Sequence, residues 1–163
     1  MEVVATSLVA VLGTLLGSSL TYVFQRRTAL RAEQFTRGER LRQERIDAYS
    51  AFAGALANFR RGQMDYWFAK HADRLTDGES VHDLQREAQR LRAADLEAMF
   101  RAEMLTPSPE LDAKGRQALR AIDLIRETDD RDTLAPARDA SRSAIYDFAA
   151  AARHHIPGLV DSR

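Results

Sequence analysis

An uncharged stretch of 22 residues, from Val3 to Phe24, constrains this chain more than any other feature. An α-helix needs about 20 predominantly apolar residues to cross a hydrocarbon core roughly 30 Å thick, so the stretch is long enough for a transmembrane helix. Apart from Tyr22, its polar side chains are Ser and Thr, which can hydrogen-bond to the backbone of their own helix. The sequence therefore predicts a membrane span over residues 1–24.

Two other interpretations of this stretch fit less well. A signal peptide would begin with basic residues and carry a shorter apolar core, whereas the charge that precedes this stretch is Glu2. A core helix of a soluble bundle would keep a polar face. Arginines beside a span favour the cytoplasmic side, and Arg26, Arg27 and Arg31 follow at once. We therefore expect a single-pass protein of the cell membrane, with the N-terminus outside and the C-terminal region in the cytoplasm.

A stripe of small residues runs along the predicted span and includes a GxxxG motif. Its members recur at intervals of three and four, which places them on one face of a helix. Small residues allow two helices to approach closely in lipid, so the stripe predicts a homo-oligomer or docking to another membrane protein. A chance match among the Gly and Ala of the span is the open alternative. The stripe consists of Thr6, Ala10, Gly13, Gly17 and Thr21.

A basic helical neck is predicted over residues 25–44. Residues 25–61 carry nine Arg against four acidic residues, a surplus of +5 that the formal net charge of +0 for the whole chain hides. The preferred interpretation is a topology signal on a solvated helix. Arg26, Arg27 and Arg31 can also contact anionic lipid headgroups, at about 1 kcal/mol for each basic residue. Interleaved Glu residues argue against nucleic acid, so no nucleic-acid partner is predicted.

Four amphipathic segments without a competing strand pattern fill residues 45–163. Apolar residues recur at three and four, which is typical of core-facing helices. Ser80, three residues before Asp83, and Ser108 before Pro109 are typical helix starts. With short loops between them, the segments predict an all-α fold in which an antiparallel four-helix bundle follows the neck. The expected helices cover about 46–72, 81–105, 109–125 and 134–156.

No pattern in the sequence identifies a reaction or a cofactor. The chain has no Cys, which excludes disulfides and thiolate chemistry. Glu79 and His82 have the Glu-x-x-His spacing of di-iron bundles, but a second such element is absent from the sequence. We therefore predict no catalysis, no metal and no cofactor. A metal-binding or enzymatic bundle tethered to the membrane stays open as an alternative.

Three consecutive aromatic residues, Tyr66, Trp67 and Phe68, lie near the end of the first bundle segment. Three neighbours on a helix span about 200°, so all three cannot face one core. The loop that follows can cover the outward side chain, which is the preferred interpretation. Trp and Tyr are also frequent anchors of interfaces, so Tyr66 and Trp67 are weak candidates for a partner or self-association surface.

The segments "LGSSLTYVFQRRT" and "ERLRQERIDAYSAFAGAL" resemble short actinobacterial single-pass membrane proteins with an Arg-rich helical cytoplasmic region and no assigned function. This resemblance covers about the first 60 residues and implies an anchored helical protein. Together with the bundle, it predicts a membrane-anchored interaction protein, either an adaptor or an oligomeric scaffold. A sensor of anionic lipid surfaces is a further alternative.

Overall fold

The computed structural model of the chain describes residues 2–71 and 80–158; among the first 30 residues it describes side chains only at Tyr22 and 25–28. The chain divides into two compact units, Met1–Leu41 and Arg42–Arg163. The described residues contain helices and no strand, which confirms the all-α prediction. The elements are α1 (Glu2–His71), α2 (Val81–Leu105), α3 (Pro109–Asp123), the short 3₁₀ helix η1 (Leu124–Glu127) and α4 (Arg131–His154).

The first unit consists of the N-terminal part of α1. Side chains described between residues 22 and 41 are all exposed, including Phe35, and Glu33 pairs with Arg37 at 2.5 Å. Among the described residues, no helix has the length and apolar character that crossing a membrane requires. Apart from Tyr22, the side chains of the predicted span lie outside the described ones. The span, and the division into span, neck and bundle, stay predictions.

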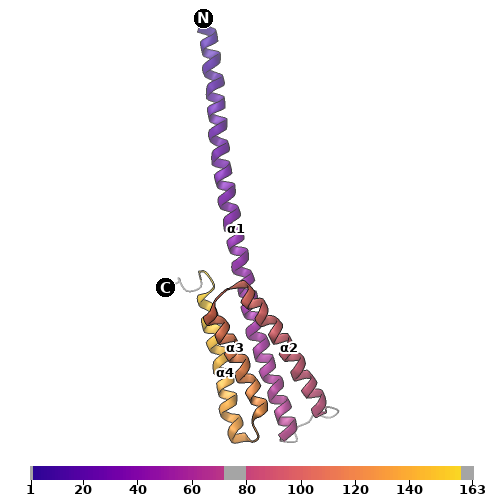
Figure 1. The fold of residues 1–163 in the computed structure, drawn as a ribbon. Coiled ribbons are helices and arrows are strands. Elements are labelled where there is room, and N and C mark those ends of the chain that lie inside the picture. Colours follow the sequence, from indigo (N-terminus) through magenta and orange to yellow (C-terminus); the bar gives the residue numbers. More distant parts are fainter. Residues whose placement is uncertain (1, 72–79, 159–163) are drawn as a thin grey trace. The chain divides into compact units, whose positions relative to one another are not determined.

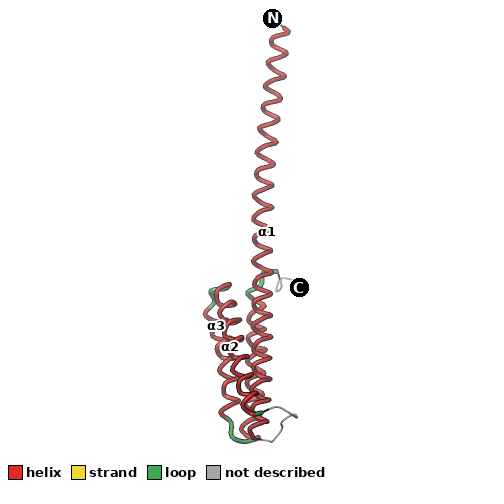
Figure 2. Tube along the Cα trace, turned by 90° about the vertical axis from the view of Figure 1, so that its right-hand side faces the viewer, coloured by secondary structure: helices red, strands yellow, loops and turns green. Residues whose placement is uncertain are grey.

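The second unit is a set of four packed helices, made from the C-terminal part of α1 and from α2, α3 and α4 (Figures 1 and 2). Each helix runs antiparallel to the next one along the chain, as Figure 1 shows. The connection between α2 and α3 is short, and η1 leads from α3 toward α4. The arrangement agrees with the four helices expected from the sequence.

The core of the second unit contains the apolar stripes of all four helices. Phe52 of α1 meets Phe148 of α4 edge to face, with ring centroids 4.7 Å apart. Gly115 of α3 lies so close to this pair that a Cβ atom there would come within 2.8 Å of the Phe52 ring. The predicted core positions are buried at, among others, Tyr49, Phe52, Leu56 and Phe59 of α1, and Leu111, Ala118, Ile122 and Ile125 of α3 and η1.

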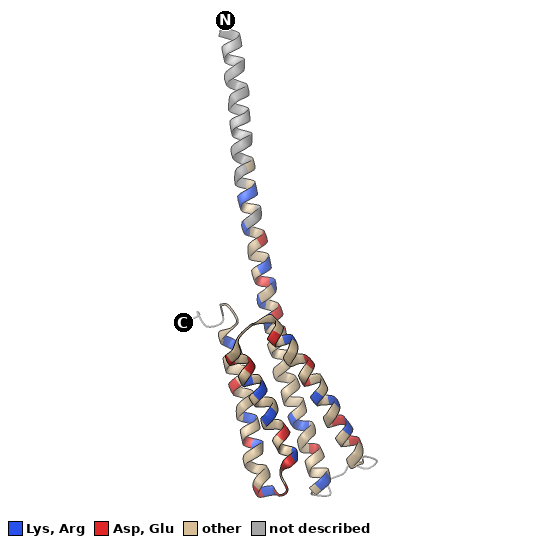
Figure 3. Ribbon diagram, viewed as in Figure 1, with Lys and Arg blue, Asp and Glu red and all other residues tan. Residues whose placement is uncertain are grey.

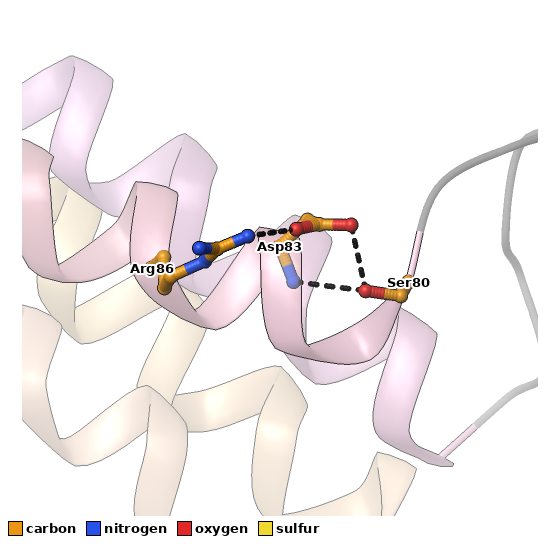
Figure 4. A network of polar contacts seen from close by, with 3 residues as sticks. All are labelled: Ser80, Asp83 and Arg86. Atoms are coloured by element: carbon orange, nitrogen blue, oxygen red, sulfur yellow. Dashed lines mark hydrogen bonds and ion pairs between the residues drawn. The ribbon is translucent and has the colours of Figure 1, made fainter.

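The N-terminus of α2 is capped by Ser80, as the sequence predicts. The Ser80 hydroxyl accepts a hydrogen bond from the Asp83 backbone N–H at 3.2 Å and donates one to the Asp83 carboxylate at 2.7 Å (Figure 4). Arg86 pairs with the other carboxylate oxygen at 2.5 Å. A capping side chain satisfies a backbone donor that has no partner within the helix. These contacts fix the start of α2 at Val81.

The start of α4 differs from the prediction. The helix begins at Arg131, three residues before the expected Leu134, because Asp130 and Thr133 form a capping box. The Thr133 N–H donates to the Asp130 carboxylate at 2.8 Å, and the Asp130 N–H donates to the Thr133 hydroxyl at 3.4 Å. Pro136 therefore lies inside the helix rather than in its first turn. The sequence contains this capping pair within the polar stretch 128–133, which the prediction placed between two helices.

Two arginines at the start of the second unit contact the ends of other helices. Arg45 donates to the carbonyl of Leu105, the last residue of α2, at 3.2 Å, and to the carbonyl of His155, just after α4, at 3.5 Å. Arg42 donates to the carbonyl of Pro157 at 2.8 Å. Carbonyls at helix C-termini have no partner within the helix, so the Arg45 contacts satisfy orphan acceptors of α2 and α4. Arg42 instead binds the turn that follows α4.

Candidate functional site

The two aromatic candidates of the sequence have different environments. Trp67 is only 2% exposed. Its indole N–H donates to the Thr128 carbonyl at 2.8 Å, and its ring stacks on His71 at 4.7 Å. This places Trp67 in the core of the bundle, where it continues the buried stripe of α1. Tyr66 is only partly buried and lines a cleft, so it alone of the two is accessible from solvent.

The cleft beside Tyr66 has a volume of about 410 Å³. Residues of α1, α2, α3 and η1 form its walls. Most of these side chains are polar, with amides, guanidinium groups, carboxylates and one phenol. The lining consists of Gln63, Tyr66, Gln85, Ala88, Gln89, Arg92, Asp123, Arg126 and Glu127.

An ion pair and a buried amide define the polarity of this cleft. Arg92 of α2 donates two hydrogen bonds to the carboxylate of Asp123, both at 3.1 Å, in a bidentate arrangement that ties α2 to the end of α3. Gln63 of α1 is 4% exposed, and its Oε1 atom has no hydrogen-bond partner among the described residues. A buried acceptor without a partner costs free energy. The wall of the cleft therefore contains a buried acceptor whose hydrogen-bonding capacity is unused.

Asp95 is a charged residue in the core near this ion pair. It is 0% exposed, and neither carboxylate oxygen has a hydrogen-bond partner among the described residues. Burial is the main cause that raises the pKa of Asp95 to about 7; the Asp123 carboxylate raises it further and Arg92 lowers it. Close to neutral pH, the side chain therefore exchanges between the carboxylic acid and the carboxylate.

Sequence analysis missed Asp95 as a special position, although a signal was present. The residue lies seven positions after Ala88 and seven before Ala102, so it falls on the buried stripe of α2. An acidic residue on a stripe of small and apolar residues is rarely buried without a partner. Gln63 was also missed, for a similar reason: it lies on the α1 stripe between Phe59 and Trp67.

The lining of the cleft consists mainly of amide, guanidinium, carboxylate and phenol groups. Among its described residues there is no Ser, Thr or His that could serve as a nucleophile with an adjacent base. The described residues contain no group of three or more His, Asp or Glu side chains able to hold a metal ion. His82 is exposed on α2, and its predicted companion Glu79 lies outside the described residues.

The remaining predicted site residues belong to the first unit. Arg26, Arg27 and Arg31 are exposed, as contact with lipid headgroups requires. The side chains of Thr6, Ala10, Gly13, Gly17 and Thr21 lie outside the described ones, so their role in self-association stays a prediction.

Comparison with known proteins identifies one family. The KilB plasmid transfer protein family matches residues 46–156, which cover most of the bundle. The chain belongs to this family. No curated protein and no solved structure matches the chain. The matched region begins at the start of the buried α1 stripe and ends at Ile156, so the family match coincides with the packed part of the second unit.

Proposed function

We propose that this protein acts in plasmid transfer as a non-catalytic, membrane-anchored helical interaction protein, either an adaptor or an oligomeric scaffold. The family match over residues 46–156 is the observation that carries the proposal, because it links the bundle itself to plasmid transfer. In this proposal the bundle lies in the cytoplasm and the N-terminus outside the membrane.

The cleft beside Tyr66 supports an interaction role for the bundle. Its amides, the Tyr66 hydroxyl and Arg126 offer hydrogen-bonding groups at a partly enclosed surface, and Gln63 adds an unsatisfied acceptor. Binding sites combine a concave surface with a small number of placed polar groups. We propose that a partner protein of the transfer machinery inserts a donor side chain into this cleft.

The anchoring part of the proposal rests on the sequence. Residues 3–24 carry no charge, and the exposed Arg26, Arg27 and Arg31 follow. Fractionation of cells that express the full chain or a variant without residues 1–24 tests it. We expect the full chain in the membrane fraction, resistant to carbonate extraction, and the shortened chain in the soluble fraction. A full chain in the soluble fraction would contradict the anchor.

A tagged pull-down from plasmid-bearing cells, with membranes solubilised in mild detergent, tests the interaction role. We expect a stoichiometric partner or recovery of the protein at a multiple of its 18.3 kDa mass. The double variant Gln85→Ala/Gln89→Ala should lose a partner that binds the cleft. The matched control is Gln117→Ala/Arg120→Ala on exposed positions of α3. A monomer without a partner, combined with unchanged plasmid transfer on deletion of the gene, would refute the proposal.

Self-association through the predicted span has its own test. The double variant Gly13→Leu/Gly17→Leu places two large side chains on the small-residue stripe and should abolish chemical cross-linking in membranes. The matched control is Val9→Leu/Val11→Leu, which enlarges two side chains of the same segment outside the stripe. Unchanged cross-linking of the glycine variant would remove the span as the contact.

A further inference from the structure

One face of the bundle, between α1 and α4, carries a row of arginines. We call it the basic face and define it by Arg60 of α1 and the arginines of α4: Arg131, Arg138, Arg142 and Arg153. Figure 3 shows basic residues in blue and acidic residues in red along the helices of the bundle. Successive residues of an α-helix are rotated by about 100° around its axis. If the angular position of Arg131 is set to 0°, the four arginines of α4 lie between about −20° and +40°.

The acidic residues of α4 lie on the flank of the helix next to this row, and Asp139 is close enough to interact electrostatically with Arg60. On the same scale, the acids within α4 lie between about +80° and +160°. On α1, Asp47 and Asp65 lie about 140° from Arg60, so they point to another flank of the helix. Asp130 precedes α4 and is engaged in the capping box. The acids within α4 are Asp132, Asp139 and Asp147.

Arg60 is held in place by contacts to α4. Its Nε atom donates to the Ser141 hydroxyl at 3.1 Å, and its Nη2 atom donates to the Arg138 carbonyl at 3.1 Å. Burial lowers the pKa of Arg60, and the guanidinium groups of Arg138 and Arg142 lower it further, while Asp139 opposes them. The three arginines are therefore close enough to repel one another. Such repulsion costs stability unless an anion binds.

Apolar and aromatic groups accompany the arginines. A hollow of about 240 Å³ lies between Arg131 and Arg138, with Phe68, Leu134 and Ala135 in its lining. Tyr146 is 63% exposed, and the Arg142 guanidinium lies 5.8 Å from the centre of its ring. Exposed aromatic rings next to arginines provide surfaces on which nucleic-acid bases stack.

We propose that the basic face binds single-stranded nucleic acid, with the arginines on phosphates and with Tyr146 and the hollow beside Phe68 receiving bases. The row from Arg131 to Arg153 extends over about 33 Å at 1.5 Å per residue, enough for several nucleotides. A lipid headgroup surface would be served by charge alone, whereas this face adds an exposed ring and a hollow. The expectation that nucleic acid is no partner was drawn from the neck, residues 25–44, whereas this face belongs to the bundle and combines its arginines with an exposed ring and a hollow.

Fluorescence anisotropy of the full-length protein in a neutral detergent tests the proposal. The probe is a fluorescein-labelled oligothymidylate of about 30 nucleotides, titrated over a range of salt concentrations. We expect saturable binding, tighter than to a duplex of the same length. The triple variant Arg131→Gln/Arg138→Gln/Arg142→Gln should weaken binding at least about tenfold. It should also reduce the slope of log K against log salt by about 2, since each phosphate contact on a single strand contributes about 0.7.

A matched control removes the same charge from another face. The triple variant Arg86→Gln/Arg90→Gln/Arg101→Gln changes three exposed arginines of α2 and should leave both affinity and slope nearly unchanged. Tyr146→Ala should weaken binding by at least about fivefold through lost stacking. Circular dichroism of every variant confirms that the helices are intact.

Four outcomes would overturn the proposal. The first is the absence of saturable binding by the wild-type protein at low salt. The second is an equal loss of affinity in the α2 control, and the third is duplex binding as tight as single-strand binding. The fourth is binding of short-chain phosphatidylserine micelles, but not of the oligonucleotide, that depends on the same three arginines; this would assign the face to lipid. None of these measurements depends on the cleft partner or on the membrane anchor.

Discussion

The charged stretch of α1 before residue 42 and the bundle after it share one helix but gain stability in different ways. In the first stretch the described side chains are exposed, and Glu33 and Arg37 pair along the helix at i and i+4. In the bundle, α1 buries Tyr49, Phe52, Leu56 and Phe59 against other helices. Backbone hydrogen bonds of a helix are local, whereas most helical stability in proteins comes from packing of an apolar face.

This difference shows that helix formation alone says little about function. The first stretch is helical because it lacks Pro and is rich in good helix formers. The described side chains of this stretch are exposed. The bundle, by contrast, has a cleft, two buried polar side chains without partners and a row of arginines. The candidates of the bundle depend on side chains from distant positions that meet, whereas those of the first unit stay predictions from the sequence.

Truncation of aromatic side chains gives the largest expected contrast. Phe148→Ala removes a ring that is 1% exposed and packed on Phe52, and should destabilise the bundle by about 3–5 kcal/mol. Phe35→Ala removes a ring that is 75% exposed and should change the free energy of unfolding by less than about 0.5 kcal/mol. Urea unfolding in neutral detergent, followed by circular dichroism, measures both. A large loss for Phe35→Ala would show that this ring has a partner.

Asp95 gives a pH-dependent contrast within the bundle. Because the pKa of Asp95 in the folded state, about 7, lies above its unfolded value, the folded state binds the proton more tightly. Its contribution to stability is complete below about pH 4 and is lost as the pH rises to about 7. Each pKa unit corresponds to about 1.4 kcal/mol, so a rise from 3.8 to about 7 gives a total loss of about 4 kcal/mol.

The variant Asp95→Asn tests this linkage. It cannot ionise, so the difference in unfolding free energy between wild type and variant should shift in favour of the variant between pH 4 and 8. Arg92 and Asp123 are the charged groups that face the site. Chemical unfolding at several pH values measures the difference. A difference that does not change with pH would mean that Asp95 is ionised throughout.

Glycine to alanine substitutions sharpen the comparison with a change of a single methyl group. At Gly115 the new Cβ would lie 2.8 Å from a Phe52 ring atom, and overpacking of this kind costs about 1–3 kcal/mol. At Gly38 and Gly54 nothing lies within 4 Å of the new atom, so the better helix propensity of Ala should stabilise by up to about 1 kcal/mol. Melting temperatures of the three variants give the order. A stabilising Gly115→Ala would contradict the close packing of α3 against α1.

Polar contacts give the smallest expected contrast. Ser108→Ala removes the N-cap of α3, whose hydroxyl accepts from the Leu111 N–H at 3.3 Å, and should cost about 1 kcal/mol. Arg37→Ala breaks an exposed ion pair and should cost about 0.5 kcal/mol or less. Thermal unfolding at low and high salt separates them, because only the ion pair is weakened by salt. Equal costs at both salt concentrations for Arg37→Ala would argue against a Coulombic contribution.

The sequence was sufficient for those parts of the fold that depend on local patterns. The bounds of α2, and Ser108 with Pro109 at the start of α3, were predicted correctly. The start of α4 was placed too late because the prediction put the polar stretch 128–133, which contains the capping pair, between two helices. Most of the candidate site was not predicted. Its clefts, the unpartnered Asp95 and the contacts of Arg60 depend on which helices become neighbours, and periodicity along one helix does not contain that information.

The contacts made by Arg42 and Arg45 have a mechanical consequence. Their hydrogen bonds connect α1 to the end of α2 and to the residues after α4 at one end of the bundle. The hydrogen bond from Trp67 to Thr128 connects α1 to the other end of the bundle. A displacement of α1 along its axis by one turn, about 5.4 Å, would break all of these contacts together. A pulling force on α1 would therefore meet resistance at both ends of the bundle at once, and the helix would yield in one step rather than slide gradually.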